Sequence, residues 1–132
     1  MTAQILQRPL HVHIASERAV PLMQALWKHK LDGSDYAVQA VSMLTLSQVL
    51  EVFLMNGGKA TDVAPLFNIS CSNLEDMLHE TNKTLYHWQG YAQTISENDE
   101  RSDDQKLTLQ VVAEIYQILR NGLQSQLKAS ET

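Results

Sequence analysis

The apolar residues of this chain recur with the 3.6-residue period of an α-helix, and no segment alternates apolar and polar residues as a half-buried strand does. The pattern therefore predicts an all-α protein of about six helices. A length of 132 residues corresponds to one domain, residues 1–132, and 44% hydrophobic residues are enough to form a core.

Local signals divide this pattern into separate helices. A first helix is predicted over about residues 16–31, and Ser34 is a candidate cap for the next one. Thr45 and Gln48 have the spacing of a capping box, in which two side chains satisfy the free amides of a helix start, so a further helix is expected to begin there. Gly57 and the glycine after it should end that helix, since glycine takes the left-handed conformation without strain.

The stretch ATDVAPLFNISCSNLEDML, residues 60–78, has the pattern of a helix-turn-helix. Such a motif needs a small residue where its helices cross, a residue tolerant of the left-handed conformation in the turn, an aliphatic residue in the angle, and apolar positions that seal the second helix. Those positions hold Ala64, Asn68, Ile69, and Leu74 with Met77 or Leu78. We predict the motif over about residues 60–90, with Ser72 and Glu75 as the capping box of the second helix.

Candidate DNA contacts are polar and basic residues just before the motif, at the predicted turn and along the second helix: Lys59, Ser70, Ser72, Asn73 and Lys83. Asparagine reads adenine, whereas serine and lysine contact phosphate. Glu75 and Asp76 at the start of the same helix would repel phosphate, although carboxylates there also stabilise helices that never meet DNA. Ordinary packing of two short helices gives the same pattern, so the motif alone does not establish DNA binding.

The negative charge is concentrated between the last two predicted helices. Residues 94–105, TISENDERSDDQ, hold five acids and Arg101, and so contribute −4 of the formal net charge of −5. We predict an acidic loop over 94–105, followed by an amphipathic C-terminal helix over about 106–128. The rest of the chain is almost neutral, which is a poor basis for gripping the phosphate backbone unaided, because that affinity comes from several Lys or Arg side chains.

The C-terminal helix carries an apolar row at alternating steps of three and four residues: Leu109, Val112, Tyr116, Leu119 and Leu123. That spacing forms the seam of a helix pair, although two heptads are too few for an independent coiled coil. The row is expected either to cover the core or to form the interface of a dimer, and the sequence favours neither alternative. These five residues are the candidate interface.

A second apolar feature is the aromatic patch Tyr86, Trp88 and Tyr91 with His87. Such side chains mostly serve cores, so we expect the patch to be mainly core, with part of it available as contact surface.

Several function classes lack the residues that they need. The single cysteine, Cys71, excludes a disulfide framework and a multi-cysteine zinc site, and no acidic or cysteine ligand accompanies His11 and His13, so we expect no metal or other cofactor. The chain has no glycine-rich phosphate loop and no nucleophile elbow, and we predict no enzyme. No apolar run approaches the roughly 18 to 20 residues that span a bilayer, and the N-terminus lacks the features of a signal peptide. We therefore expect no membrane contact and a cytoplasmic location.

Two resemblances bear on function. The glycine stop followed by the helix-turn-helix pattern generically resembles regulators of the LuxR type. Residues 32–52, DGSDYAVQAVSMLTLSQVLEV, are similar to the FlhD subunit of the bacterial flagellar master activator, in which a turn containing glycine and an acidic, alanine-rich helix precede a Leu-Thr-Leu-Pro-Gln helix start. The match runs through Leu44, Thr45, Leu46 and Gln48, with Ser47 in place of the proline. It continues weakly through the helix-turn-helix and covers about half of the chain.

The FlhD resemblance implies a small all-helical subunit that forms a homodimer and assembles with a cysteine-rich, zinc-binding FlhC-type partner. The complex binds DNA and activates transcription, and the partner supplies much of the DNA contact. A solitary Cys71 fits the D-type subunit, since the C-type needs a cysteine cluster.

Three hypotheses follow. The first is an FlhD-like transcription regulator that needs the partner. The second is a self-sufficient dimeric helix-turn-helix regulator that presents residues 70–83 to DNA. The third is a helical adaptor or antagonist that does not bind DNA and uses its acidic loop against a basic protein surface.

Overall fold

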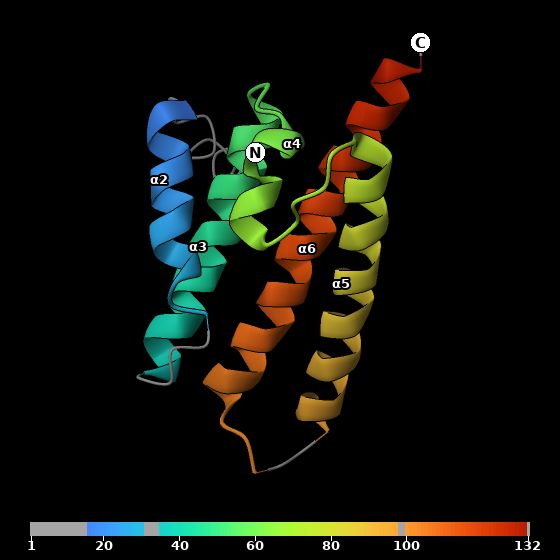
Figure 1. Cartoon of the computed structure of the whole chain (residues 1–132). Helices are drawn as coiled ribbons and strands as arrows, with labels where there is room; N and C mark the ends of the chain where they lie inside the picture. Colours follow the sequence, from blue (N-terminus) through green and yellow to red (C-terminus); the bar gives the residue numbers. More distant parts are fainter. Residues whose placement is uncertain (1–15, 31–34, 98–99, 132) are drawn as a thin grey trace, which may run out of the picture.

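The computed structural model describes residues 16–30, 35–97 and 100–131. Its helices are α2 (Ser16–Trp27), α3 (Tyr36–Met55), α4 (Ala60–Val63), the 3-10 helix η2 (Ala64–Phe67), α5 (Leu74–Ser96) and α6 (Asp103–Ser130). Figure 1 shows α5 and α6 as an antiparallel hairpin, with α3 and α2 on the α6 side and α4 near the end where α5 begins. These ranges contain no strand, so the all-α prediction is confirmed for the described part of the chain.

α3 is one continuous helix where the sequence predicted two. The side chain of Asp35 begins it by accepting a hydrogen bond from the amide of Ala37, at 2.9 Å. The predicted helix start at Thr45 is wrong, because the Thr45 hydroxyl donates to the carbonyl of Val41 one turn earlier, at 2.8 Å, as a threonine inside a helix does. Ser34, the predicted cap, lies outside the described residues.

The predicted glycine stop after α3 is confirmed. Gly57 has φ 91°, in the left-handed region, and the amide of Gly58 donates to the carbonyl of Phe53 at 2.8 Å. The side chain of Phe53 leaves no room at Gly58, where an added Cβ would lie 2.5 Å from the ring. The glycine pair therefore ends the helix and also lets the chain turn closely over it.

The core is centred on three aromatic side chains from separate parts of the chain. The ring of Trp27 meets Phe67 edge-on at 5.0 Å and Tyr116 at 5.8 Å between centroids. The hydroxyl of Tyr116 donates to the carbonyl of Phe67 at 2.8 Å. Burial removes water from this phenol and raises the pKa of Tyr116 to about 12, since the charged form is disfavoured there. Tyr116 thus joins α6 to the end of η2.

The apolar row of α6 faces this core. All five of its members are buried by residues of the same chain: Leu109, Val112, Tyr116, Leu119 and Leu123. Of the two alternatives left by the sequence, the structure favours core packing, and the assignment of this row to an interface is corrected. The physical reason is that α6 lies between α3 and α5, which together cover its apolar side (Figure 1).

The predicted acidic loop is shorter than expected. α5 continues through Gly90 to Ser96, and α6 already begins at Asp103, with the hydroxyl of Ser102 accepting from the amide of Gln105 at 3.1 Å. Asp103 and Asp104 therefore occupy the first turn of α6, where carboxylates complement the helix dipole. Half of the segment 94–105 is helical, which weakens the loop as a separate binding element.

The expectation that no apolar segment approaches the length of a membrane span is also corrected. α3 has 20 residues, and its most apolar 18-residue window has a mean hydropathy of 1.5, so the helix is long and apolar enough to cross a bilayer by length and composition alone. Core helices of soluble proteins pass the same criterion, and 56% of the most apolar window of α3 is buried inside the protein.

Candidate functional site

The first half of the predicted helix-turn-helix is an α-helical turn that tightens into a 3-10 helix. Ala60 to Phe67 span α4 and η2, and Pro65 stands at the first turn of η2. Asn68 then adopts φ 69°, in the left-handed region, and the amide of Ile69 donates to the carbonyl of Ala64 at 3.0 Å. Ala64 and Ile69 are buried. The small residue, the left-handed residue and the aliphatic residue therefore take the positions that the sequence indicated.

The connection to the second helix differs from the prediction. Residues 70–73 are not helical, so six residues, 68–73, separate η2 from α5. A DNA-reading helix-turn-helix has a turn of three or four residues. Leu74, Met77 and Leu78 pack against the core as expected, but the longer connection gives α5 a later start than the motif requires.

Asn73 caps α5, and the capping box predicted for Ser72 and Glu75 is wrong. The Oδ1 of Asn73 accepts from the amide of Asp76 at 2.8 Å, and its Nδ2 donates to the Oδ2 of Asp76 at 3.0 Å. Both ends of the Asn73 amide are therefore engaged at the helix start. Reading an adenine edge requires a free amide, so DNA contact by Asn73 would need the cap to open.

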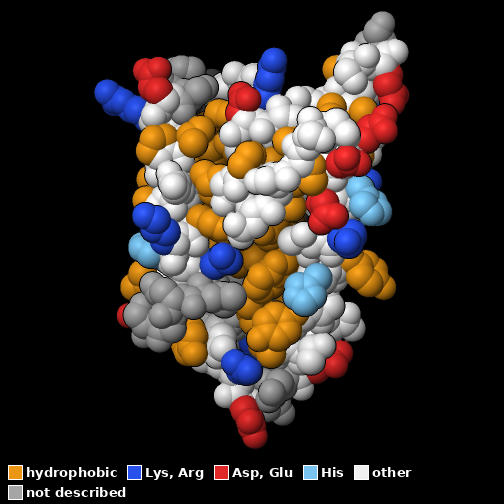
Figure 2. All heavy atoms as spheres, in the orientation of Figure 1, with side chains coloured by type: hydrophobic (Ala, Val, Ile, Leu, Met, Phe, Trp, Pro, Cys, Tyr) orange, Lys and Arg blue, Asp and Glu red, His pale blue; other side chains and the backbone are white. Residues whose placement is uncertain are grey.

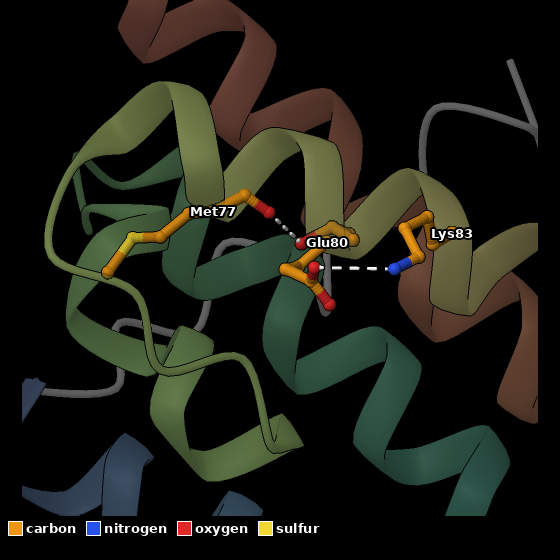
Figure 3. Close-up of polar contacts among 4 residues, drawn as sticks. Met77, Glu80 and Lys83 are labelled. Atoms are coloured by element: carbon orange, nitrogen blue, oxygen red, sulfur yellow. Dashed lines mark hydrogen bonds and ion pairs between the residues drawn. The ribbon is translucent and has the colours of Figure 1, made fainter.

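The predicted DNA contacts do not form one basic surface. Ser70, Ser72 and Asn73 are exposed together in the connection, whereas Lys59 is exposed just before α4. Lys83 lies ten residues beyond Asn73 along α5, a rise of about 15 Å. Its ammonium pairs with a carboxylate oxygen of Glu80 at 3.6 Å (Figure 3). The Lys83 side chain is mostly exposed and that of Glu80 about half exposed. The hydroxyl of Thr81, between them in the sequence, donates to the carbonyl of Met77 at 2.7 Å and so stays within the helix.

The start of α5 is acidic. Glu75 and Asp76 occupy its first turn, both exposed, and Glu80 follows in the next turn. Figure 2 shows acidic side chains at the upper right, over the region where α5 begins. The carboxylates interact favourably with the positive end of the helix dipole. They would repel the phosphates of a DNA backbone placed against the same surface. This surface, residues 70–80, is called the α5 tip below.

The aromatic patch is less buried than predicted. Trp88 packs against the core, but Tyr86 is 80% exposed and Tyr91 is also exposed. Trp88 contacts His87 and Tyr91 edge-on, each at 5.9 Å between centroids. No group of three or more His, Cys, Asp or Glu in the described ranges could hold a metal ion, and His11 and His13 lie outside those ranges.

A groove that the sequence analysis did not predict lies between the end of α3 and the last turns of α6. It has a volume of about 560 Å³, and its lining includes Leu54, Met55 and Gly122. A Cβ added at Gly122 would lie 3.1 Å from the Cβ of Ala60, so the glycine permits the close packing of α6 against α4. The only signal for this contact was a glycine inside an otherwise helical pattern.

The chain matches no protein-family model, no curated protein and no solved structure. The similarity to FlhD therefore rests on the residues of the sequence alone.

Proposed function

We propose that this chain is a helical subunit of a transcription-regulating complex, in which a basic partner makes most of the contacts to DNA. The single observation that carries the proposal is the α5 tip, where a helix-turn-helix-like frame ends in an acidic surface. Such a surface is suited to a basic protein and unsuited to bare phosphate, because like charges would meet without compensation.

The partner proposed is a zinc-binding protein of the FlhC type. Support comes from the similarity of residues 32–52 to FlhD-type subunits and from the near neutrality of the chain outside residues 94–105. In this arrangement Ser70 and Ser72 remain exposed beside the partner and contact phosphate, while Glu75 and Glu80 pair with its basic side chains. The complex would be cytoplasmic, as expected for a regulator of transcription.

Gel-shift experiments with the purified chain, alone and with a candidate zinc-binding partner of the FlhC type, test the proposal. We expect specific DNA binding by the mixture and none by the chain alone. Equally tight, sequence-specific binding by the chain alone would support the self-sufficient regulator instead.

Charge variants locate the partner's contact. Glu75→Gln together with Glu80→Gln removes two acids from the α5 tip and spares the Asn73 cap. We expect partner affinity to fall about tenfold or more, with a weaker dependence on salt. Glu114→Gln, an exposed acid on α6, is the control for the loss of a carboxylate elsewhere. An equal effect of both changes would show that net charge matters and the α5 tip does not.

A further inference from the structure

The groove between the end of α3 and the last turns of α6 exists because small residues line it. Gly122, Ser125 and Ala129 follow one another at steps of three and four residues, so they lie on one face of α6. Their side chains fill little of the space beside them. On the other wall, α3 ends at Met55, and Gly58 follows in place of a further helical turn. These features leave a hollow of about 560 Å³ between the two helices.

The floor of the groove is apolar and closed. A Cβ added at Gly122 would lie 3.1 Å from the Cδ1 of Leu54, so α6 is in contact with α3 at this glycine. Ala60, at the start of α4, is 1% exposed, and Ile118 packs against the core one turn before Gly122. An apolar molecule in the groove therefore rests on apolar side chains and loses contact with water, which is the main driving force for binding apolar ligands.

Glu51 is the only ionisable side chain among the described residues that line the groove. Its carboxylate forms no ion pair or hydrogen bond with another described residue. Gln126, which also lines the groove, is engaged at both ends of its side-chain amide. It accepts from the backbone amide of Thr61 and donates to the Thr61 hydroxyl, each at 3.1 Å. The groove thus presents one unpaired negative charge beside an apolar floor.

The ends of the two helices add to this negative potential. α3 and α6 run in the same direction, so their C-terminal ends lie at the same end of the protein (Figure 1). The C-terminal end of a helix carries a partial negative charge, which attracts cations within the last turn. The last turn of α3 contains no basic residue, and that of α6 contains Lys128. Neither Lys128 nor Lys59 lines the groove, so no described cation offsets Glu51 inside it.

The volume of the groove matches a small molecule better than a helix of another protein. Binding sites for small molecules measure about 300–1,000 Å³, and this groove lies within that range. One helical turn with its side chains, about 10 Å across and about 5.4 Å long, occupies about 400 Å³. The groove therefore holds little more than one turn, whereas helices that dock in grooves use about two turns or more.

We propose that this groove binds a small organic cation with an apolar body, such as an arylalkylamine. The apolar body lies against Leu54, Ala60 and Ile118, and the ammonium group meets the carboxylate of Glu51 near the end of α3. The inference goes beyond the proposed function and does not depend on it, because the groove shares no residue with the α5 tip.

A second hollow in the described part of the chain offers a control. It lies between α5 and α6, has a volume of about 360 Å³, and is lined mostly by polar side chains, among them Gln93, Gln110 and Glu114. Glu114 stands beside amides there, whereas Glu51 stands beside an apolar floor. Both hollows thus contain one carboxylate, but of the two the groove is the better place to bury an apolar body.

Amide NMR titrations of the full chain test the proposal with phenylbutylamine, phenylbutanol and phenylbutyrate, which share an apolar body and differ in charge. We expect the amine to bind on the order of threefold more tightly than the alcohol, since an exposed ion pair adds little to the apolar contact, and the carboxylate to bind most weakly. The amide signals of Gly58 and Gly122 should shift, and that of Gly90 on α5 should not. Absent binding, shifts away from the groove, or equal or tighter binding of the alcohol or the carboxylate would overturn the proposal.

Three variants separate the charge from the shape of the groove. Glu51→Gln should lower the affinity for the amine to that for the alcohol and leave the alcohol unchanged, whereas Glu114→Gln in the second hollow should change neither. Ser125→Trp places an indole in the groove and should weaken all binding at least about tenfold, because a filled site has no room for the ligand. Circular dichroism checks that each variant folds. Equal effects of the two Glu→Gln changes, or normal binding by a folded Ser125→Trp variant, would reject the groove as the site.

Discussion

α3 and α6 are long helices that pack against each other, yet they divide their surfaces differently. α6 is amphipathic: its apolar row is buried, and residues such as Gln110 and Glu114 face solvent. α3 buries Met43, Leu46 and Leu50 on one side and leaves an apolar row exposed on the other. The difference teaches that a regular apolar row with polar residues opposite it marks the core, while a helix without a clear polar side leaves apolar side chains exposed.

The largest expected loss of stability comes from a valine-to-alanine change on α6, compared with the same change on α3. Val112→Ala on α6 removes two buried methyl groups and should lower the free energy of unfolding by about 2–3 kcal/mol. Val41→Ala on α3 should change it by no more than about 0.5 kcal/mol, since that side chain is mostly exposed. Urea denaturation at low protein concentration compares the two. Similar losses would mean that Val41 is covered within the monomer, and the contrast between the two helices would fail.

The second prediction concerns the hydrogen bond by which the Tyr116 hydroxyl attaches α6 to the end of η2. Tyr116→Phe leaves the carbonyl of Phe67 without its partner and should cost about 1–3 kcal/mol. The raised pKa of Tyr116 also predicts a pH dependence. An unfolded tyrosine titrates near 10 and the folded one near 12, so its contribution is complete below about pH 10 and is lost as the pH rises towards 12. Urea denaturation as a function of pH should show this loss in the wild type, and Tyr116→Phe should reduce it.

The parts of the structure that the sequence predicted depend on local chemistry. Asn68 takes the left-handed conformation and Gly57 ends α3, because these residue types tolerate that backbone wherever they stand. The apolar row of α6 follows from its spacing. Whether α3 or another copy covers that row depends on contacts far apart in the sequence, which spacing does not reveal.

The wrong predictions have the same physical cause: short-range spacing does not show which contacts form between distant parts of the chain. A threonine three residues before a glutamine looks the same inside a helix as at its start, so Thr45 was assigned a cap that the continuous α3 does not need. Ser72 and Asn73 both stand three residues before an acid, and the packing of Leu74 and Leu78 against the core accompanies the start at Asn73. At the candidate site, the sequence predicted the turn and the acidic charge but not the longer connection.

The start of α5 can be tested by changing its two competing caps. Asn73→Ala removes the side chain that accepts from the amide of Asp76 and should cost about 1 kcal/mol, whereas Ser72→Ala should cost less than about 0.5 kcal/mol. Thermal unfolding of the two variants gives the comparison. If Ser72→Ala is the more damaging change, α5 begins one residue earlier and the connection shortens to five residues, 68–72.

The smallest effect decides whether α3 is one helix, and its sign is more informative than its size. Inside a continuous helix, Thr45→Ala replaces a β-branched residue by the best helix former and should raise the free energy of unfolding by about 0.5 kcal/mol. At a helix start, the same change would remove a cap and lower it by about 1 kcal/mol. Thr45 is exposed, so changes in core packing do not obscure the result. A gain in stability supports a continuous α3 from Tyr36 to Met55, and a loss would show that a separate helix begins near Thr45.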